Sequence, residues 1–93
     1  FQAVHRDFAF VVDNVVSAGE ILRAARSADK NLVVDASVFD VYEGDNVGED
    51  KKSVAISVTL QPTEATLTDE KIEAVVKKIT TEVKQRTGGV LRG

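Results

Sequence analysis

The chain has 93 residues, of which 43% are hydrophobic and 29% are charged, and its formal net charge is −3. This length suits one small globular domain, and the acidic balance argues against a broad basic surface for nucleic acid. Cysteine is absent, which excludes disulfides and thiolate metal sites, and no apolar run approaches the roughly 20 residues of a membrane-spanning helix.

Two further features of the composition concern the context of the domain. Residues 1–46 contain 4 of the 12 lysines and arginines and residues 47–93 contain the other 8, so any anion-attracting surface should use Lys51, Lys52 and the last helix. The lack of cysteine favours a reducing compartment. The chain contains no methionine, and we expect one domain over residues 1–93 that comes from a longer polypeptide.

The first part of the chain predicts a strand followed by a helix. Residues 6–13 predict the strand, and its stretch 8–12 is apolar on both faces, which is typical of a central strand in a sheet. Ser17 and Glu20 then match a capping box, in which each side chain accepts a backbone N–H at the start of a helix. The helix should run to about residue 28 and bury a face made of Ile21, Leu22, Ala25 and Ala28.

Residues 32–43 predict a long second strand whose hydrophobic phase changes part-way along. A bulge near Ser37 or Val38 would explain the change, because one extra residue moves the following side chains to the opposite face. The side chains expected to face the core are Val34, Ala36, Phe39 and Val41.

The next hairpin, with its loop at residues 44–50 and its third strand at 52–61, is expected to have two different faces. One face of the third strand carries Val54, Ile56, Val58 and Leu60, and the other carries Ser53, Ala55, Ser57 and Thr59. The same alternation would place Tyr42, Asp40 and Ser53 together on the outer face. An aromatic ring beside hydrogen-bonding groups is how proteins hold unpaired nucleotide bases.

A second helix is expected from Thr68, whose hydroxyl can cap it, to the glycine pair at 88–89. Its apolar residues recur at helical spacing at Ile72, Val75, Val76, Ile79 and Val83. Residues 90–92 are long enough for a closing strand. The order β-α-β-β-α-β is that of the ferredoxin-like α+β fold, a four-stranded antiparallel sheet with both helices on one face and the other face open.

Catalysis and metal binding have little support in the sequence. The single histidine, His5, precedes the first strand and is expected to be a surface or capping residue. Asp45, Glu49 and Asp50 lack the spacing of a calcium-binding loop, and the glycines form no phosphate-binding motif.

The candidate residues of the open face also have simpler interpretations. Tyr42 can pack on its strand neighbours, and Asp40 can discourage edge-to-edge pairing of sheets. Lys51 and Lys52 can serve solubility. The residue patterns alone therefore leave the ligand of the open face undetermined.

Five stretches taken together resemble the ferredoxin-fold anticodon-binding family, which forms the C-terminal domain of the phenylalanyl-tRNA synthetase β subunit. They are FQAVHRD at 1–7, FDVYEG at 39–44, KKS at 51–53, TLTDE at 66–70 and VLRG at 90–93. The resemblance covers the whole chain, in order and at the spacing of the family.

The resemblance implies that the open sheet face receives the anticodon loop of the phenylalanine tRNA. By position, Tyr42 matches the tyrosine on which the first anticodon base stacks, and Asp40 and Ser53 match the hydrogen-bonding partners of that base. Ala9 matches a small residue that lets the nucleotide lie close. Lys51 and Lys52 are expected to add attraction for the RNA.

The resemblance also implies what the domain does not do alone. The domain itself would perform no reaction and need no cofactor. Its cytoplasmic parent, a phenylalanine–tRNA ligase, would use ATP and Mg²⁺ at a site in the α subunit. The partners would be the tRNA, the rest of the β subunit and the α subunit of a heterotetramer, and the isolated domain is expected to be a monomer.

Some positions depart from the family pattern. Gln2 and Gly48 stand where the family often has proline, Asp50 where it often has glycine, and Glu43 and Asp45 where relatives are frequently basic. These departures should make the hairpin loop more flexible and more acidic, and should weaken its attraction for phosphate.

Two other functions are compatible with a ferredoxin-like fold. A small-molecule regulatory domain, such as an amino-acid sensor, would be expected to have a glycine-rich loop after the first strand, where residues 13–16 read DNVV. A protein-interaction domain would be expected to have large apolar side chains on the open sheet, where the third strand has small ones.

Overall fold

The computed structural model describes residues 2–44, 47–63 and 66–92. The elements in chain order are β1 (Val4–Asp13), α1 (Ala18–Ala28), β2 (Val33–Tyr42), β3 (Lys51–Leu60), α2 (Asp69–Thr87) and β4 (Val90–Leu91). This order confirms the β-α-β-β-α-β arrangement expected from the sequence. Asp45, one of the acidic loop residues, lies outside the described residues.

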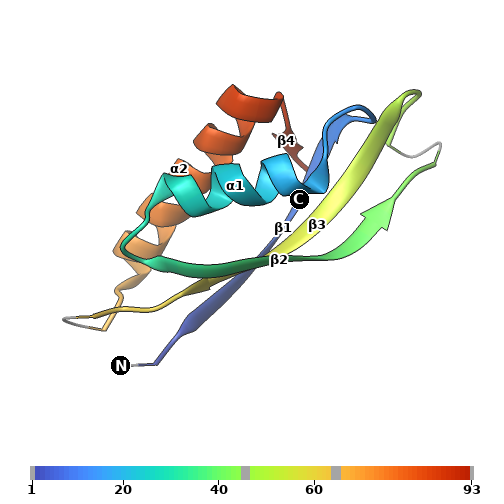
Figure 1. Ribbon diagram of the computed structural model, residues 1–93. Coiled ribbons are helices and arrows are strands. Elements are labelled where there is room, and N and C mark those ends of the chain that lie inside the picture. Colours follow the sequence, from blue (N-terminus) through green and yellow to red (C-terminus); the bar gives the residue numbers. More distant parts are fainter. Residues whose placement is uncertain (1, 45–46, 64–65, 93) are drawn as a thin grey trace.

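The four strands form one sheet in the order β2-β3-β1-β4, and every neighbouring pair is antiparallel. Strand β1 therefore lies between β3 and β4, as its two apolar faces predicted. Both helices lie on one side of the sheet, and the sheet continues beyond them toward the β2–β3 hairpin (Figure 1). The ferredoxin-like fold is thus confirmed, and no described element covers the opposite side of the sheet, which we call the open face.

The core lies between the sheet and the two helices. Alternate residues of β1 and β3 face the helices, so the rings of Phe8 and Phe10 are neighbours and stack with their centroids 5.8 Å apart. The largest fully buried side chains are Phe10, Val12, Ile21, Val54, Ile56, Val58, Leu60, Ile79 and Val83. The apolar row predicted on β3 is therefore confirmed as part of this core, beside the inward residues of β1.

The helix ends form as the sequence indicated. Ser17 and Glu20 make the reciprocal capping box, with Ser17 N donating to Glu20 Oε2 at 3.1 Å and Glu20 N donating to Ser17 Oγ at 3.2 Å. Thr68 Oγ1 accepts the N–H of Lys71 at the start of α2. Gly88 ends α2 with a left-handed φ of 76°, which glycine adopts without steric cost.

The buried face of α1 differs from the predicted one. Ile21 and Ala25 are fully buried as expected, but so is Ala24, whereas Leu22 and Ala28 are only partly buried against the core. Ala24 lies one turn from Ile21 and one turn from Ala28, at the centre of the helix stripe, so its neighbours occupy the edges of that stripe.

Strand β2 departs most from the expectation. Its register against β3 shifts twice, between Val33 and Asp35 and between Val38 and Asp40. The first shift leaves Val33 in the core and Val34 58% exposed, so the prediction that Val34 faces inward is wrong. Ala36 is buried as predicted.

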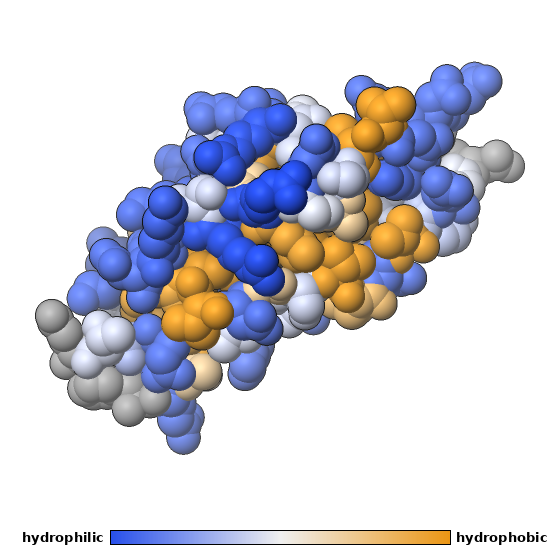
Figure 2. Space-filling view, viewed as in Figure 1, coloured by the Kyte–Doolittle hydropathy of each residue, from blue (hydrophilic) through white to orange (hydrophobic). Residues whose placement is uncertain are grey.

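The second shift lies close to the predicted bulge and places Phe39 outside the regular ladder, where its side chain is 58% exposed. Val41 pairs with Val54 on the helix side but remains 50% exposed, because this end of the sheet extends beyond the helices. The prediction that Phe39 and Val41 enter the core is therefore wrong. Figure 2 shows apolar atoms exposed on the surface toward this end of the molecule.

Candidate nucleic-acid interface

The open face is built from two rows of side chains that cross the strands. Directly paired residues of antiparallel strands point to the same face, and rows two residues apart are separated by roughly 6.5 Å. The first row, which we call the tyrosine row, consists of Tyr42, Ser53, Val11 and Val90. The second, the aspartate row, consists of Asp40, Ala55, Ala9 and Arg92, whose backbone N–H donates to Ala9 O at 2.7 Å. Four of the sequence-predicted residues, Tyr42, Asp40, Ser53 and Ala9, thus lie together in two adjacent rows.

The ring of Tyr42 lies against the backbone of Gly44. A Cβ placed on Gly44 would come within 2.7 Å of the Tyr42 hydroxyl oxygen and 3.0 Å of its Cζ. The absence of a side chain at Gly44 therefore lets the ring take its place at the end of β2. The side chain of Tyr42 is 42% exposed, so one part of the ring remains accessible to a ligand.

The floor beside the ring consists of small side chains. Ala55 and Ala9 pair with each other and lie between Asp40 on β2 and Arg92 after β4. Asp40 is exposed, whereas Ser53 is only 5% exposed because it lies inside the tyrosine row. The register therefore puts Tyr42, Asp40 and Ser53 on one face, as the alternation predicted, but neighbouring side chains largely cover Ser53.

Arg92 is a residue of this face that the sequence-based reasoning did not include. Its guanidinium carbon lies 5.8 Å from the centroid of the Tyr42 ring, within the range of a cation–π contact. The signal was present in the sequence, because Arg92 follows Val90 by two residues and so shares a strand face with it. Only the pairing of β4 with β1 places that face beside Ala9.

Lys51 and Lys52 lie on different sides of the sheet. Lys51 pairs with Asp13 two residues beyond Val11 and Ser53, so it shares the open face, and its Nζ forms an ion pair with the Asp13 carboxylate. Lys52 pairs with Val12, which faces the core, so Lys52 lies on the helix side. Of the two lysines expected to attract the RNA, only Lys51 therefore lies on the open face.

The other charged side chains that the structure describes on the open face are acidic. Asp7 and Asp35 occupy positions further along β1 and β2 on the same face, and His5 Nδ1 lies 3.1 Å from Thr59 Oγ1 across β1 and β3. His5 is thus an exposed surface residue, as expected, but it lies within β1 rather than before it and is hydrogen-bonded to the neighbouring strand β3. A face with scattered acids and few cations suits a flat polar base better than a run of phosphates.

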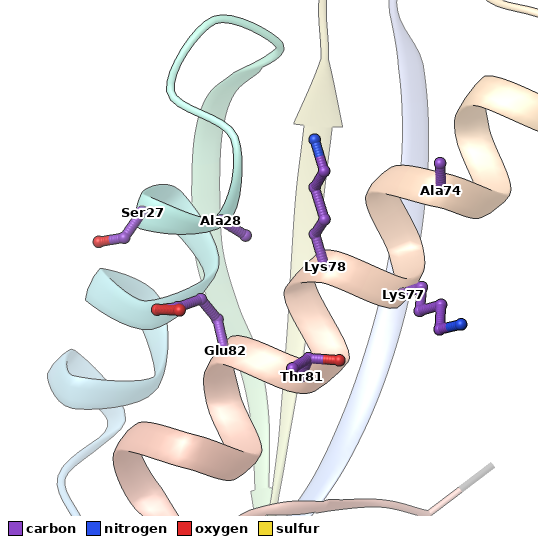
Figure 3. A pocket seen from close by; sticks show the side chains of 7 residues that line it. All are labelled: Ser27, Ala28, Ala74, Lys77, Lys78, Thr81 and Glu82. Atoms are coloured by element: carbon purple, nitrogen blue, oxygen red, sulfur yellow. The ribbon is translucent and has the colours of Figure 1, made fainter.

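Two hollows lie away from the rows of the open face. One, of about 450 Å³, lies between α1 and α2 (Figure 3), where Glu82 extends toward α1 and Lys77 points away. The other, of about 470 Å³, lies at the β2–β3 hairpin. Its lining residues include the acids Glu43, Glu49 and Asp50 beside Lys51. Neither lining contains an aromatic side chain, so neither offers a surface on which a base could stack.

Across residues 2–44, 47–63 and 66–92, no three histidine or acidic side chains gather as a metal site. Neither described helix is both long and apolar enough to cross a membrane.

Comparisons with known proteins agree over the whole chain. The family described as the ferredoxin-fold anticodon binding domain matches residues 1–92. The chain is 59% identical over 93 residues to the phenylalanine–tRNA ligase beta subunit of Mesorhizobium japonicum, and 59% identical over 92 residues to that of Paramagnetospirillum magneticum. These matches cover 100% and 99% of the chain, and the chain spans 12% of the length of each of these relatives.

Proposed function

The chain belongs to the ferredoxin-fold anticodon-binding domain family, and on this premise we propose that its open face binds the anticodon loop of a phenylalanine tRNA. The observation that carries the proposal is the gathering of Tyr42, Asp40, Ser53 and Ala9 in two adjacent rows of one sheet face. A small-molecule regulatory role or a protein-interaction role gains no support from the relatives.

The chemistry of this proposal is recognition of one unpaired base. The base stacks on the exposed part of the Tyr42 ring, as unpaired bases do on aromatic side chains. Asp40, one residue row away, presents carboxylate oxygens that accept hydrogen bonds, which suits the adjacent N–H donors of a guanine edge. The Ser53 hydroxyl lies next to Tyr42, and Ala9 with Ala55 keeps the floor low enough for the nucleotide to approach.

Attraction for the RNA backbone is a smaller part of the proposal. Lys51 is the cation on the open face at the hairpin end, and its ion pair with Asp13 partly neutralises its charge. Lys52, on the helix side, contributes only to the wider electric field around the hairpin. Because few cations face the RNA, we expect modest affinity and a shallow salt dependence.

The larger protein is inferred from the relatives. We infer that this chain is one domain of a phenylalanine–tRNA ligase beta subunit, because it matches 12% of the length of proteins with that name. Its contribution would be to position the tRNA while it performs no reaction itself. ATP and Mg²⁺ would act at a catalytic site outside residues 1–93, in a cytoplasmic assembly of α and β subunits.

The proposal is tested by titrating an anticodon stem-loop of phenylalanine tRNA into the wild-type chain and Tyr42→Ala at low salt. Loss of a stacked base costs roughly 1–3 kcal/mol, so the substitution should weaken binding by about 5- to 150-fold. Val34→Ala is the control, because it truncates an exposed side chain at the far end of the same strand. Equal affinity of Tyr42→Ala and Val34→Ala would remove Tyr42 from the site.

A further inference from the structure

Arg92 reaches the Tyr42 ring from the opposite edge of the sheet, on the same open face. The two residues lie at β4 and β2, which β1 and β3 separate, so their backbones are roughly 14 Å apart at three strand spacings. The guanidinium nevertheless lies 5.8 Å from the ring centroid. It can do so because its neighbours along the aspartate row, Ala9 and Ala55, have only small side chains.

A backbone hydrogen bond to β1 fixes the position of Arg92 in the absence of any ligand. Its backbone N–H donates to Ala9 O at 2.7 Å, which extends the pairing of β4 with β1 by one residue. Its side chain is therefore directed across the open face by the sheet itself.

Among the described residues, the Arg92 guanidinium forms no ion pair and no hydrogen bond. Lys51, Lys78 and Arg86 each form an ion pair, and Arg26 donates to Ala36 O, whereas Arg92 has neither kind of contact within the described ranges. Its cation–π contact is made to the one ring that the proposed function uses. All of its N–H donors remain available to a ligand.

The distance between the Arg92 guanidinium and the Tyr42 ring is close to the distance that a base stacked between them would need. A base stacked between two flat groups needs about 7 Å, twice the roughly 3.4 Å separation of stacked bases. The observed 5.8 Å is longer than a direct stack and short of that value by about one ångström. A small outward movement of a long, exposed side chain would make the room.

We propose that Arg92 is the second wall of the nucleotide site, so that an unpaired base of the RNA loop is held between the Tyr42 ring and the Arg92 guanidinium. The proposal rests on the proposed function and adds a residue to its site. Arginine suits this position because its planar guanidinium stacks on bases, which the compact ammonium of lysine does not do. Without RNA the same guanidinium lies over the ring and leaves part of it exposed.

The test uses the fact that Tyr42 is the only tyrosine in a chain without tryptophan, so intrinsic fluorescence reports directly on this ring. The anticodon stem-loop is titrated into the wild type, Arg92→Gln, Arg92→Lys and Arg23→Gln, and both RNA anisotropy and tyrosine fluorescence are recorded. Arg23→Gln is the matched control, because it removes the same charge from an exposed position on α1. Arg92 is exposed and outside the core, so its variants should fold, which circular dichroism checks.

The expected result is quenching of Tyr42 in the wild type and binding weakened by about fivefold or more in Arg92→Gln, the loss expected for one stacking partner. Arg92→Lys should lie clearly below the wild type, and Arg23→Gln should lie within about twofold of it. Equal affinity of Arg92→Gln and Arg23→Gln overturns the clamp and leaves the proposed function standing. Full rescue by Arg92→Lys also overturns it, because a point charge would then suffice.

Two other outcomes of the same titration would contradict the proposed function itself. RNA binding that leaves the Tyr42 fluorescence of the wild type unchanged places the RNA away from this face and overturns both proposals. Absence of binding to the wild type in both signals overturns them as well.

Discussion

The position of the Tyr42 ring depends on the absence of a side chain at Gly44, because the ring lies where that side chain would be. A methyl group there would meet the far end of the tyrosine at 2.7 Å, and that end can swing aside. Gly44 does not have a positive φ, so alanine can adopt its backbone conformation. The cost of the substitution should therefore fall on the position of the ring rather than on the fold.

We predict that Gly44→Ala changes the free energy of unfolding by less than about 0.5 kcal/mol, yet weakens binding of the anticodon stem-loop and alters tyrosine fluorescence. Urea titration measures the first quantity and RNA titration the second. Gly19→Ala serves as control, because it adds a methyl group on α1, away from the open face. Retention of full affinity by Gly44→Ala would show that the ring position is unimportant.

The two adjacent lysines should differ in function because they occupy opposite sides of the sheet. We predict that Lys51→Gln lowers the slope of log affinity against log salt by about 1, the effect of one lost phosphate contact, whereas Lys52→Gln leaves the slope nearly unchanged. Stem-loop titrations at several salt concentrations measure this. Equal changes for the two substitutions would contradict the division between the faces.

The turn between α2 and β4 determines where Arg92 lies. It contains two glycines, Gly88 and Gly89, which the turn requires for different reasons. Gly88 has a positive φ, whereas Gly89 is buried. A Cβ on Gly89 would come within 2.9 Å of Val12 Cγ1 and 3.0 Å of Val83 Cγ1. Both valines are core residues, so neither has free space into which to move.

We predict that Gly89→Ala destabilises the fold by about 1–3 kcal/mol through overpacking, measured as the free energy of unfolding in urea. Val83→Ala in the same chain should offset part of this loss, because it removes the methyl groups that the new Cβ would meet. Gly88→Ala is the comparison, since a Cβ there meets nothing within 4 Å and only its φ opposes the change. Strict additivity of Gly89→Ala and Val83→Ala would refute the packing explanation.

The edges of the sheet decide how the whole molecule behaves in solution. Strand β2 is one edge, and its two register shifts interrupt the ladder that another chain could extend. Strand β4 is the other edge, with only two residues. The exposed large hydrophobic residues of the β2 edge are Val34, Phe39, Val41 and Tyr42. They do not form one continuous row, because Val34 and Phe39 lie at the two register shifts, and Val41 and Tyr42 point to opposite faces.

From these edges and the net charge of −3 we predict a monomer. Sedimentation equilibrium across a wide range of protein concentration should return a mass near 10.0 kDa. A mass that rises with concentration would indicate pairing through an edge strand. Phe39→Ser, at the exposed bulge of β2, would then identify which edge is involved.

Much of the fold could be read from the sequence because its signals are local. The capping box of Ser17 and Glu20, the glycine at the end of α2 and the alternation along β1 and β3 depend on residues a few positions apart. The same alternation put Tyr42, Asp40 and Ser53 on one face, since the pairing of β2 with β3 follows from their hairpin. The resemblance to the family supplied the role that we propose for these residues, which the alternation alone did not.

The exposure of Phe39 and Val41, the burial of Ala24 and the place of Arg92 were decided by the tertiary structure. Phe39 and Val41 are apolar and at strand spacing, but whether a helix covers them depends on how far α1 extends over the sheet. Arg92 meets Tyr42 only because β4, the last strand, pairs with β1, the first, where Val11 pairs with Val90 across 78 residues of intervening sequence. Local sequence determines which face of its own element a side chain occupies, whereas its neighbours on that face are set by contacts between distant segments.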